Sequence, residues 1–221
     1  MVQTDTDDTF KGRKVIIFNG PPGSGKDTGA LIVYNYLMIH AEYLRPRHIT
    51  FMEPVKRAAH SLYNIHEWPP NYFDQPYFPE RHKQKDVPHG EFFGLTPREA
   101  YTHVADCAKG KHGDEFLGFV MRRRMRQSSG CMVFIISDCG FIEELAPVVR
   151  LVGESNVLFI ELVAAGKNYD NDVREDLRVD VAARFPKVKI QRIMNDFDDK
   201  ELFRIYCHGA VKAFLDIQEK D

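Results

Sequence analysis

Short apolar runs alternate with amphipathic segments along most of the chain. Lys14–Phe18 (KVIIF) is rich in β-branched residues, which predicts a strand buried on both faces. The segment from Lys26 to about Glu42 then repeats apolar residues at helical spacing. Further strands are expected at His48–Met52, Met132–Ser137, Asn156–Leu162 and Lys187–Ile193, and further helices from Pro54, over Phe141–Val152, over Asp172–Ala183 and from Leu202 to Ile217. This alternation predicts an α/β fold in which helices cover both faces of a mostly parallel sheet.

One region interrupts the alternation. Glu67–Gly94 is rich in Pro, His and aromatic residues, and a loop of this length in a compact domain is usually functional. Thr96-Pro97-Arg98-Glu99 has the pattern of a capping box and predicts a helix to about Ala108, followed by a second helix over Asp114–Gln127. We therefore expect a single domain over residues 1–221 with an inserted acceptor or lid region at about 67–127.

Composition narrows the class of protein. The 30 Lys and Arg against 32 Asp and Glu give a net charge of -2, so no global field draws the chain to nucleic acid or to an anionic membrane. The four cysteines form no CxxC pair and have no histidine at zinc spacing, which favours reduced and mostly buried thiols. A polar start and the lack of an apolar run of roughly 18 residues predict a cytoplasmic protein without membrane contact.

The clearest motif lies between the first expected strand and helix. Gly20–Lys26 reads GPPGSGK and fits the GxxxxGK part of the phosphate-binding P-loop. Glycines at 20, 23 and 25 permit backbone amides to curl around an anion, and the helix that begins near Lys26 directs its positive dipole end to the same point. Lys26 would bring a full charge to the β and γ phosphates. The alternative interpretation is a glycine-rich turn without a ligand.

The motif departs from its standard form after the lysine. Asp27 stands where Ser or Thr usually holds Mg²⁺, and Thr28 follows it. Either residue could serve the metal, directly or through water. The predicted nucleotide-binding residues are Gly20, Gly23, Ser24, Gly25, Lys26, Asp27 and Thr28, with ATP and Mg²⁺ as the expected ligands. No guanine-reading NKxD motif is present, and the chain is short for a motor ATPase, so a small kinase is favoured.

Five segments, taken in order, resemble the bacteriophage deoxynucleoside monophosphate kinase group. They are FNGPPGSGKDT, MEPVKRAAHSLY, LTPREAYTHVADCAK, VFIISDCGFIEEL and YDNDVRED, which together span Lys14 to about Asp176. The GKDT form of the loop is typical of that group. The group includes kinases thought to phosphorylate 5-hydroxymethyluracil within phage DNA. The resemblance implies a three-layer P-loop NTPase fold, ATP with Mg²⁺, a deoxynucleotide acceptor, a role in phage DNA metabolism and a host-cytoplasmic location.

Asp138 is the expected catalytic carboxylate beside Lys26. It ends the Met132–Ser137 strand, and the carboxyl ends of parallel strands border the ligand crevice. There it could act through Mg²⁺ or on the attacking hydroxyl, which makes it a third candidate for the metal site with Asp27 and Thr28. Alternatively, Asp138 caps the following helix.

Four cations are candidates for binding the acceptor. Lys56 and Arg57 follow the second expected strand, where the resembled group approaches its acceptor, and Arg98 opens the TPRE helix. Arg174 matches the position of a phosphate-facing arginine in that group. A guanidinium suits phosphate better than an ammonium does. The competing interpretation for each is a solvated cation, or a surface pair in the case of Arg174.

The nature of the acceptor rests on one missing charge. Related monophosphate kinases carry Arg two residues beyond the strand-end Asp, where this chain has Gly140. The loss of a charge-assisted bond there favours an acceptor held in another way, such as a hydroxymethyl group on a base within DNA.

The basic run Met121–Arg126 could meet a DNA backbone, or be a helix with one solvated cationic face. The aromatic residues Trp68, Tyr72, Phe73, Tyr77 and Phe78 could stack on bases, or form a subdomain core.

The sequence therefore favours an ATP-dependent phosphotransferase. Phosphorylation of 5-hydroxymethyluracil in DNA is narrowly preferred over conversion of a free dNMP to dNDP. A rival of another class is a non-catalytic, nucleotide-binding regulatory protein.

Overall fold

The protein is described by a computed structural model over residues 10, 12–69, 72, 84–170, 176–196 and 198–218. Its centre is a five-stranded sheet in the order β2-β3-β1-β4-β5, in which every neighbouring pair is parallel. The strands are β1 (Lys14–Asn19), β2 (Arg47–Ile49), β3 (Val133–Ile136), β4 (Val157–Ala164) and β5 (Lys189–Asn195). This arrangement confirms the expected α/β class with a parallel sheet.

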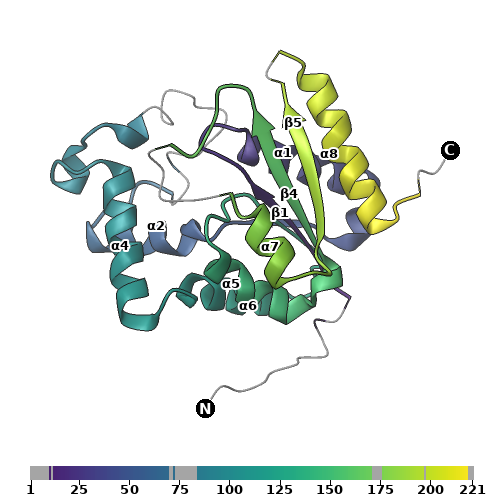
Figure 1. The fold of residues 1–221 in the computed structure, drawn as a ribbon. Coiled ribbons are helices and arrows are strands. Elements are labelled where there is room, and N and C mark those ends of the chain that lie inside the picture. The colour runs from purple at the N-terminus through teal and green to yellow at the C-terminus, as the bar shows by residue number, and fades with distance from the viewer. Residues whose placement is uncertain are drawn as a thin grey trace.

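Helices cover both faces of the sheet, which gives three layers (Figure 1). One face carries α1 (Lys26–His40) and α8 (Lys200–Leu215). The core on the other face takes residues from α2 (Met52–Leu62), α4 (Pro97–His112), α5 (Phe116–Gln127), α6 (Ile142–Val152) and α7 (Arg178–Arg184). No helix in the described ranges is long and apolar enough to cross a membrane.

Alternating residues of β1 enter two separate cores. Ile16 and Phe18 pack in the cluster beneath α1 and α8, while Val15 and Ile17 pack in the larger cluster on the opposite face. Each of these four side chains is fully buried. The expectation of a strand buried on both faces is therefore confirmed, and β1 is fixed rigidly at the centre of the sheet.

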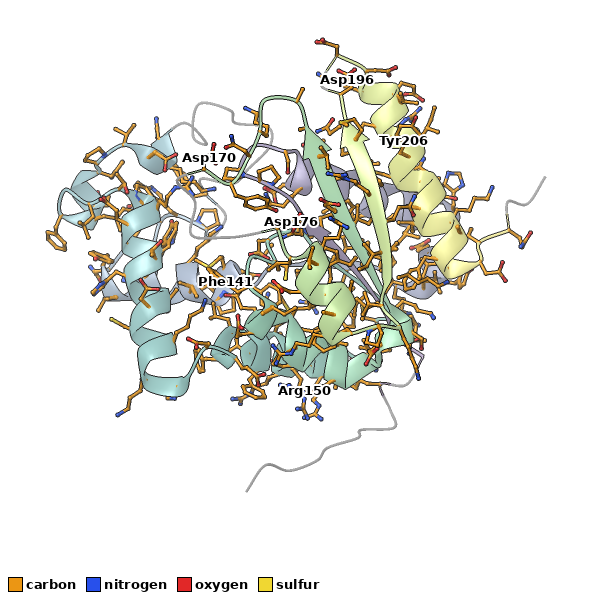
Figure 2. The ribbon with its side chains drawn as sticks, in the orientation of Figure 1. Phe141, Arg150, Asp170, Asp176, Asp196 and Tyr206 are labelled. Carbon is orange, nitrogen blue, oxygen red and sulfur yellow. The ribbon has the colours of Figure 1, made fainter. Side chains whose placement is uncertain are left out.

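The helices that follow two adjacent strands lie on opposite faces of the sheet. β1 is followed by α1 on one face, whereas its neighbour β3 is followed by α6 on the other face. In parallel sheets such a reversal opens a crevice at the carboxyl ends of the strands, where ligands bind. Figure 2 shows Asp196 at this end of the sheet and Arg150 at the opposite end.

Several element boundaries differ from the sequence-based expectation, among them the end of β2 and the start of α7. β2 ends at Ile49 rather than Met52, because α2 already begins at Met52. The helix expected over Asp172–Ala183 begins at Arg178; residues 171–175 lie outside the described residues. The Asp176 carboxylate accepts the Arg178 amide at 2.9 Å, a local side-chain contact at the start of α7.

The inserted region contributes both to the surface and to the core. The capping box is confirmed: Thr96 Oγ accepts the Glu99 amide, and the Glu99 carboxylate accepts the Thr96 amide. α4 then continues to His112, beyond the expected end. Leu117, Met121 and Met125 of α5 are buried in the larger core, so this helix belongs to the main helical layer.

Candidate functional site

The glycine-rich loop joins β1 to α1 at the carboxyl end of the sheet. Its glycines are required sterically. Gly25, the residue before α1, has φ of 95°, and a β-carbon there would collide with the Asn195 side chain. A β-carbon at Gly20 would lie 2.7 Å from the Leu162 carbonyl oxygen. Gly23 has φ of 72°. The backbone thus follows a tight curve that side chains would prevent.

A buried hydrogen bond fixes the loop to the end of β5. Asn195 Nδ2 donates to the Ser24 carbonyl oxygen at 2.8 Å, and both residues are buried. The Ser24 hydroxyl is also buried, and among the described residues it has no hydrogen-bond partner. A buried hydroxyl without a partner is costly, which indicates a polar ligand close to the loop.

Lys26 bends back over the same loop. Its ammonium donates to the carbonyl oxygens of Gly20 at 2.6 Å and Pro21 at 2.8 Å. Among the described residues, no side chain caps the N-terminus of α1, so its first amides remain turned toward the loop. Together, the curved backbone, the helix N-terminus and the ammonium form a cup suited to an anion such as a polyphosphate tail.

Asp27 is held by a relay of side chains from two neighbouring strands. The Ser137 hydroxyl, just after β3, donates to Asp27 Oδ1 at 2.7 Å. His48 Nε2 in β2 lies 3.0 Å from the same hydroxyl. Because the serine proton is directed to Asp27, we assign His48 Nε2 as the donor to the serine oxygen. Burial lowers the pKa of His48, although the negative charges of Asp27 and Glu53 partly raise it. Thr28 is exposed one residue further along α1.

Asp138 lies beside this relay and caps a helix, though not the helix expected. Its carboxylate accepts the amides of Phe51 at 2.8 Å and Met52 at 2.9 Å, at the start of α2. Burial raises the pKa of Asp138 to about 6, while these amides and Lys56 oppose the shift and Glu144 adds to it. Asp138 therefore connects the end of β3 to α2 and remains close to its own titration range at neutral pH.

Lys56 faces the carboxylates from α2. Burial, and then the charge of Lys85, lower the pKa of Lys56 to about 8, while Asp138, Asp27 and Glu53 partly oppose the shift. Lys56 is thus mostly buried within the field of both site carboxylates. Lys85 comes from the region 67–127, and its charge acts on Lys56.

Arg57 and the basic run have other partners. Arg57 is exposed and forms an ion pair with Glu53, one helical turn earlier, at 2.8 Å. Arg124, from the run Met121–Arg126, also pairs with Glu53 and donates to the Thr50 carbonyl oxygen at 2.7 Å. This part of the basic run therefore holds the start of α2 in place instead of forming a solvated cationic face.

Of the two remaining predicted cations, only Arg98 belongs to the described residues, and its ion-pair partner lies in the region 67–127. Arg98 is half-exposed and pairs with Asp86 of the short helix Gln84–Asp86 (η4) at 2.5 Å. Arg174 lies outside the described residues, as do Phe73, Tyr77 and Phe78. Trp68 and Tyr72 stack on each other with ring centroids 4.7 Å apart and pack against the larger core.

Sequence reasoning missed several residues that shape the site. Asn19, at the end of β1, donates to the Cys139 carbonyl oxygen at 3.1 Å and accepts from the Tyr169 hydroxyl at 3.0 Å. Asn195, Ser137 and His48 have equally direct roles. The only available signal was position, because Asn19, Ser137 and Asn195 are polar residues at or just after the ends of apolar strands.

The donor set is compatible with Mg²⁺. This ion is usually bound by one or two carboxylates together with substrate phosphates and water. Asp27, oriented by Ser137, and Asp138, the next residue along from that serine, supply two such carboxylates next to the cup. In the described part of the chain, no group of three or more His, Cys, Asp or Glu side chains could hold a metal.

Comparisons with known proteins add no assignment. A scan against models of protein families finds no match to this chain, and a search of curated proteins also finds none. The resemblance to the phage kinases therefore stays a prediction from the sequence motifs.

An open cavity of about 600 Å³, lined by residues that include Tyr34, Tyr43, Arg45 and Arg47, lies near the amino ends of β2 and β3, away from the glycine-rich loop.

Proposed function

We propose that the protein is an ATP-dependent phosphotransferase with a P-loop NTPase fold that acts on a deoxynucleotide acceptor. The observation that supports this most strongly is the cup formed by Gly20–Gly25, with Lys26 bent over it and Asp138 at the end of the adjacent strand β3. Anion-binding amides beside a strand-end carboxylate are the combination that phosphoryl transfer needs.

In this proposal, the loop supplies binding and the two carboxylates supply orientation. Backbone amides from Gly23 to Thr28 hold the phosphates, and the Lys26 ammonium exchanges its two carbonyl partners for phosphate oxygens. Asp138 orients the acceptor hydroxyl and takes its proton as that oxygen bonds to the γ-phosphorus and the bond to ADP breaks. Mg²⁺, bound through Asp27 and Asp138, would neutralise charge on the phosphates.

For the acceptor we propose the hydroxymethyl group of 5-hydroxymethyluracil in DNA, a step in thymidine hypermodification. The support is Gly140, which leaves out a phosphate-gripping arginine, together with the family resemblance. A free dNMP, converted to its diphosphate, is the second candidate. It gains support from Arg124, whose contacts to Glu53 and Thr50 take one arginine of the basic run away from a DNA backbone.

A transfer assay tests the proposal. The protein is incubated with Mg²⁺ and γ-labelled ATP, and offered either DNA containing 5-hydroxymethyluracil or free dNMPs that include the 5-hydroxymethyl form. Label in the DNA supports the preferred acceptor, and label only in free nucleotides replaces it with the second candidate. ATP binding without label in any acceptor would instead support a non-catalytic nucleotide-binding protein. Lys26→Met should abolish the label, whereas Lys187→Met, at the opposite end of the sheet, should not.

A further inference from the structure

The turn that follows β4 lies directly against the glycine-rich loop. A β-carbon built at Gly23 would lie 3.5 Å from Lys167 Cε and 3.6 Å from Lys167 Nζ. The Lys167 side chain therefore passes over Gly23, in van der Waals contact with the position that a β-carbon at residue 23 would occupy. An exposed lysine is thus placed at the rim of the cup, across the loop from the segment that carries Lys26.

The turn is anchored on both sides of Lys167. Before it, the Lys167 amide donates to the Ala164 carbonyl oxygen at 3.1 Å, which closes the turn at the end of β4. After it, the Tyr169 hydroxyl donates to Asn19 Oδ1 at 3.0 Å, at the end of β1. Since β1 leads directly into the glycine-rich loop, Tyr169 ties the turn to the same strand that positions the cup. Figure 2 shows Asp170, the next residue, at this end of the molecule.

The charge of Lys167 is directed to no protein group in the described residues. Within those ranges, no carboxylate or carbonyl oxygen accepts a hydrogen bond or ion pair from its ammonium. By contrast, the Lys26 ammonium has two carbonyl partners, Gly20 and Pro21. An ammonium held beside a curved row of amides, with its hydrogen-bonding capacity available, is suited to an anionic ligand.

We propose that Lys167 is a second polyphosphate-binding lysine, which holds the triphosphate tail of the nucleotide from the β4 side while Lys26 holds it from the α1 side. The inference rests on the proposed function, because it uses the same cup. Tyr169 acts as the positioning residue for Lys167. The ligand recognised is the phosphate chain and not the base, so inorganic tripolyphosphate should report the contact as well as MgATP does.

Calorimetric titration with tripolyphosphate and with MgATP tests this inference. Lys167→Met should weaken both affinities about tenfold, as expected for the loss of one partly solvated charge-assisted hydrogen bond. Lys167→Arg should retain most of the affinity. Tyr169→Phe should produce a smaller loss, and Lys167→Met should cost less affinity in the Tyr169→Phe background than alone. Lys187→Met removes the same charge at the other end of the sheet and serves as the matched control.

The outcomes separate this inference from the proposed function. If the wild-type protein binds both ligands and Lys167→Met binds them as tightly as Lys187→Met does, Lys167 is a solvated surface lysine and only this inference is overturned. If the wild-type protein binds neither ligand, the proposed function itself is overturned. Thermal denaturation should give equal midpoints for the wild-type protein and the Lys167→Met variant; a lowered midpoint would assign Lys167 a structural role instead.

Discussion

The hydroxyl of Ser137 donates a 2.7 Å hydrogen bond to the carboxylate of Asp27, across 110 positions of sequence. This contact joins the helix that follows β1 to the end of β3. It also gives a physical role to the residue that replaces the usual Ser or Thr of the motif. Asp27 is exposed, but one of its carboxylate oxygens is held in place by this bond.

Ser137→Ala should therefore weaken magnesium-dependent nucleotide binding. Without the serine hydroxyl, Asp27 loses the bond that orients it, and we expect the affinity for MgATP to fall about tenfold, the effect of one hydrogen bond to a charged group. Affinity for ATP in the presence of a chelator should stay unchanged. Calorimetry with and without Mg²⁺ measures the difference, with Ser155→Ala as an exposed control. Equal losses under both conditions would contradict a role through the metal.

Asp138→Asn should separate chemistry from helix capping. The amide can accept at only one atom, so one of the two bonds from Phe51 and Met52 is lost, and unfolding free energy should drop by about 1 kcal/mol. Phosphoryl transfer should fall about a hundredfold or more, because the variant cannot take the acceptor proton. ATP should still bind.

Asp199→Ala provides the stability-matched control for that experiment. Asp199 caps α8 by accepting the Leu202 amide at 2.8 Å. Loss of this N-cap should lower unfolding free energy by about 1 kcal/mol, measured by urea denaturation, and leave phosphoryl transfer intact. If Asp199→Ala lowered transfer as much as Asp138→Asn does, the role of Asp138 would be reduced to stability.

Lys56 should make stability depend on pH in the alkaline range. Its pKa in the folded protein is about 8, below the ordinary value of 10.5, so on lowering the pH from 10.5 to 8 the unfolded chain binds the proton first. Stability is therefore lost as pH falls through this window, and the loss is complete below pH 8. We expect Lys56→Met to be stabilised relative to the wild-type protein by about 2 to 3 kcal/mol more at pH 7 than at pH 10. A pH-independent difference in urea denaturation would contradict this.

Asn195→Ala should loosen the cup. It removes the donor to the buried Ser24 carbonyl oxygen, which costs about 1 to 3 kcal/mol of unfolding free energy. Affinity for tripolyphosphate should fall as well, because the loop amides are no longer held in one arrangement. Gln191→Ala, an exposed change on the same strand, should alter neither quantity. A stability loss with unchanged tripolyphosphate binding would show that Asn195 does not position the loop.

The local pattern was sufficient to predict the first strand, the glycine-rich loop and the following helix. In that part of the chain, the apolar run, the glycines and the helical spacing of apolar residues all lie within one continuous segment. The sequence could not show which of the two neighbours Lys56 and Arg57 faces the crevice. The preference of phosphate for a guanidinium favoured Arg57. Adjacent residues point about 100° apart on a helix. Which of them faces the crevice depends on how α2 is placed, and Asp138 sets that placement from 86 positions away.

The polar residues that support the site were harder to predict for a related reason. His48, Asn19 and Asn195 each belong to a strand, where a single polar residue carries no periodic signal. Their partners lie on other strands or loops, at separations of 89 to 171 positions. Only the order β2-β3-β1-β4-β5 brings them together, and that order could not be obtained from the alternation of strands and helices alone.

The bond between Ser24 and Asn195 also has a consequence for synthesis on the ribosome. The loop emerges well before its anchor, which lies 171 positions later in the chain. The nascent chain therefore exposes the glycine-rich segment without this restraint until β5 has been translated. The shape of the cup is completed only once β5 has joined the sheet, long after the residues of the loop itself are made.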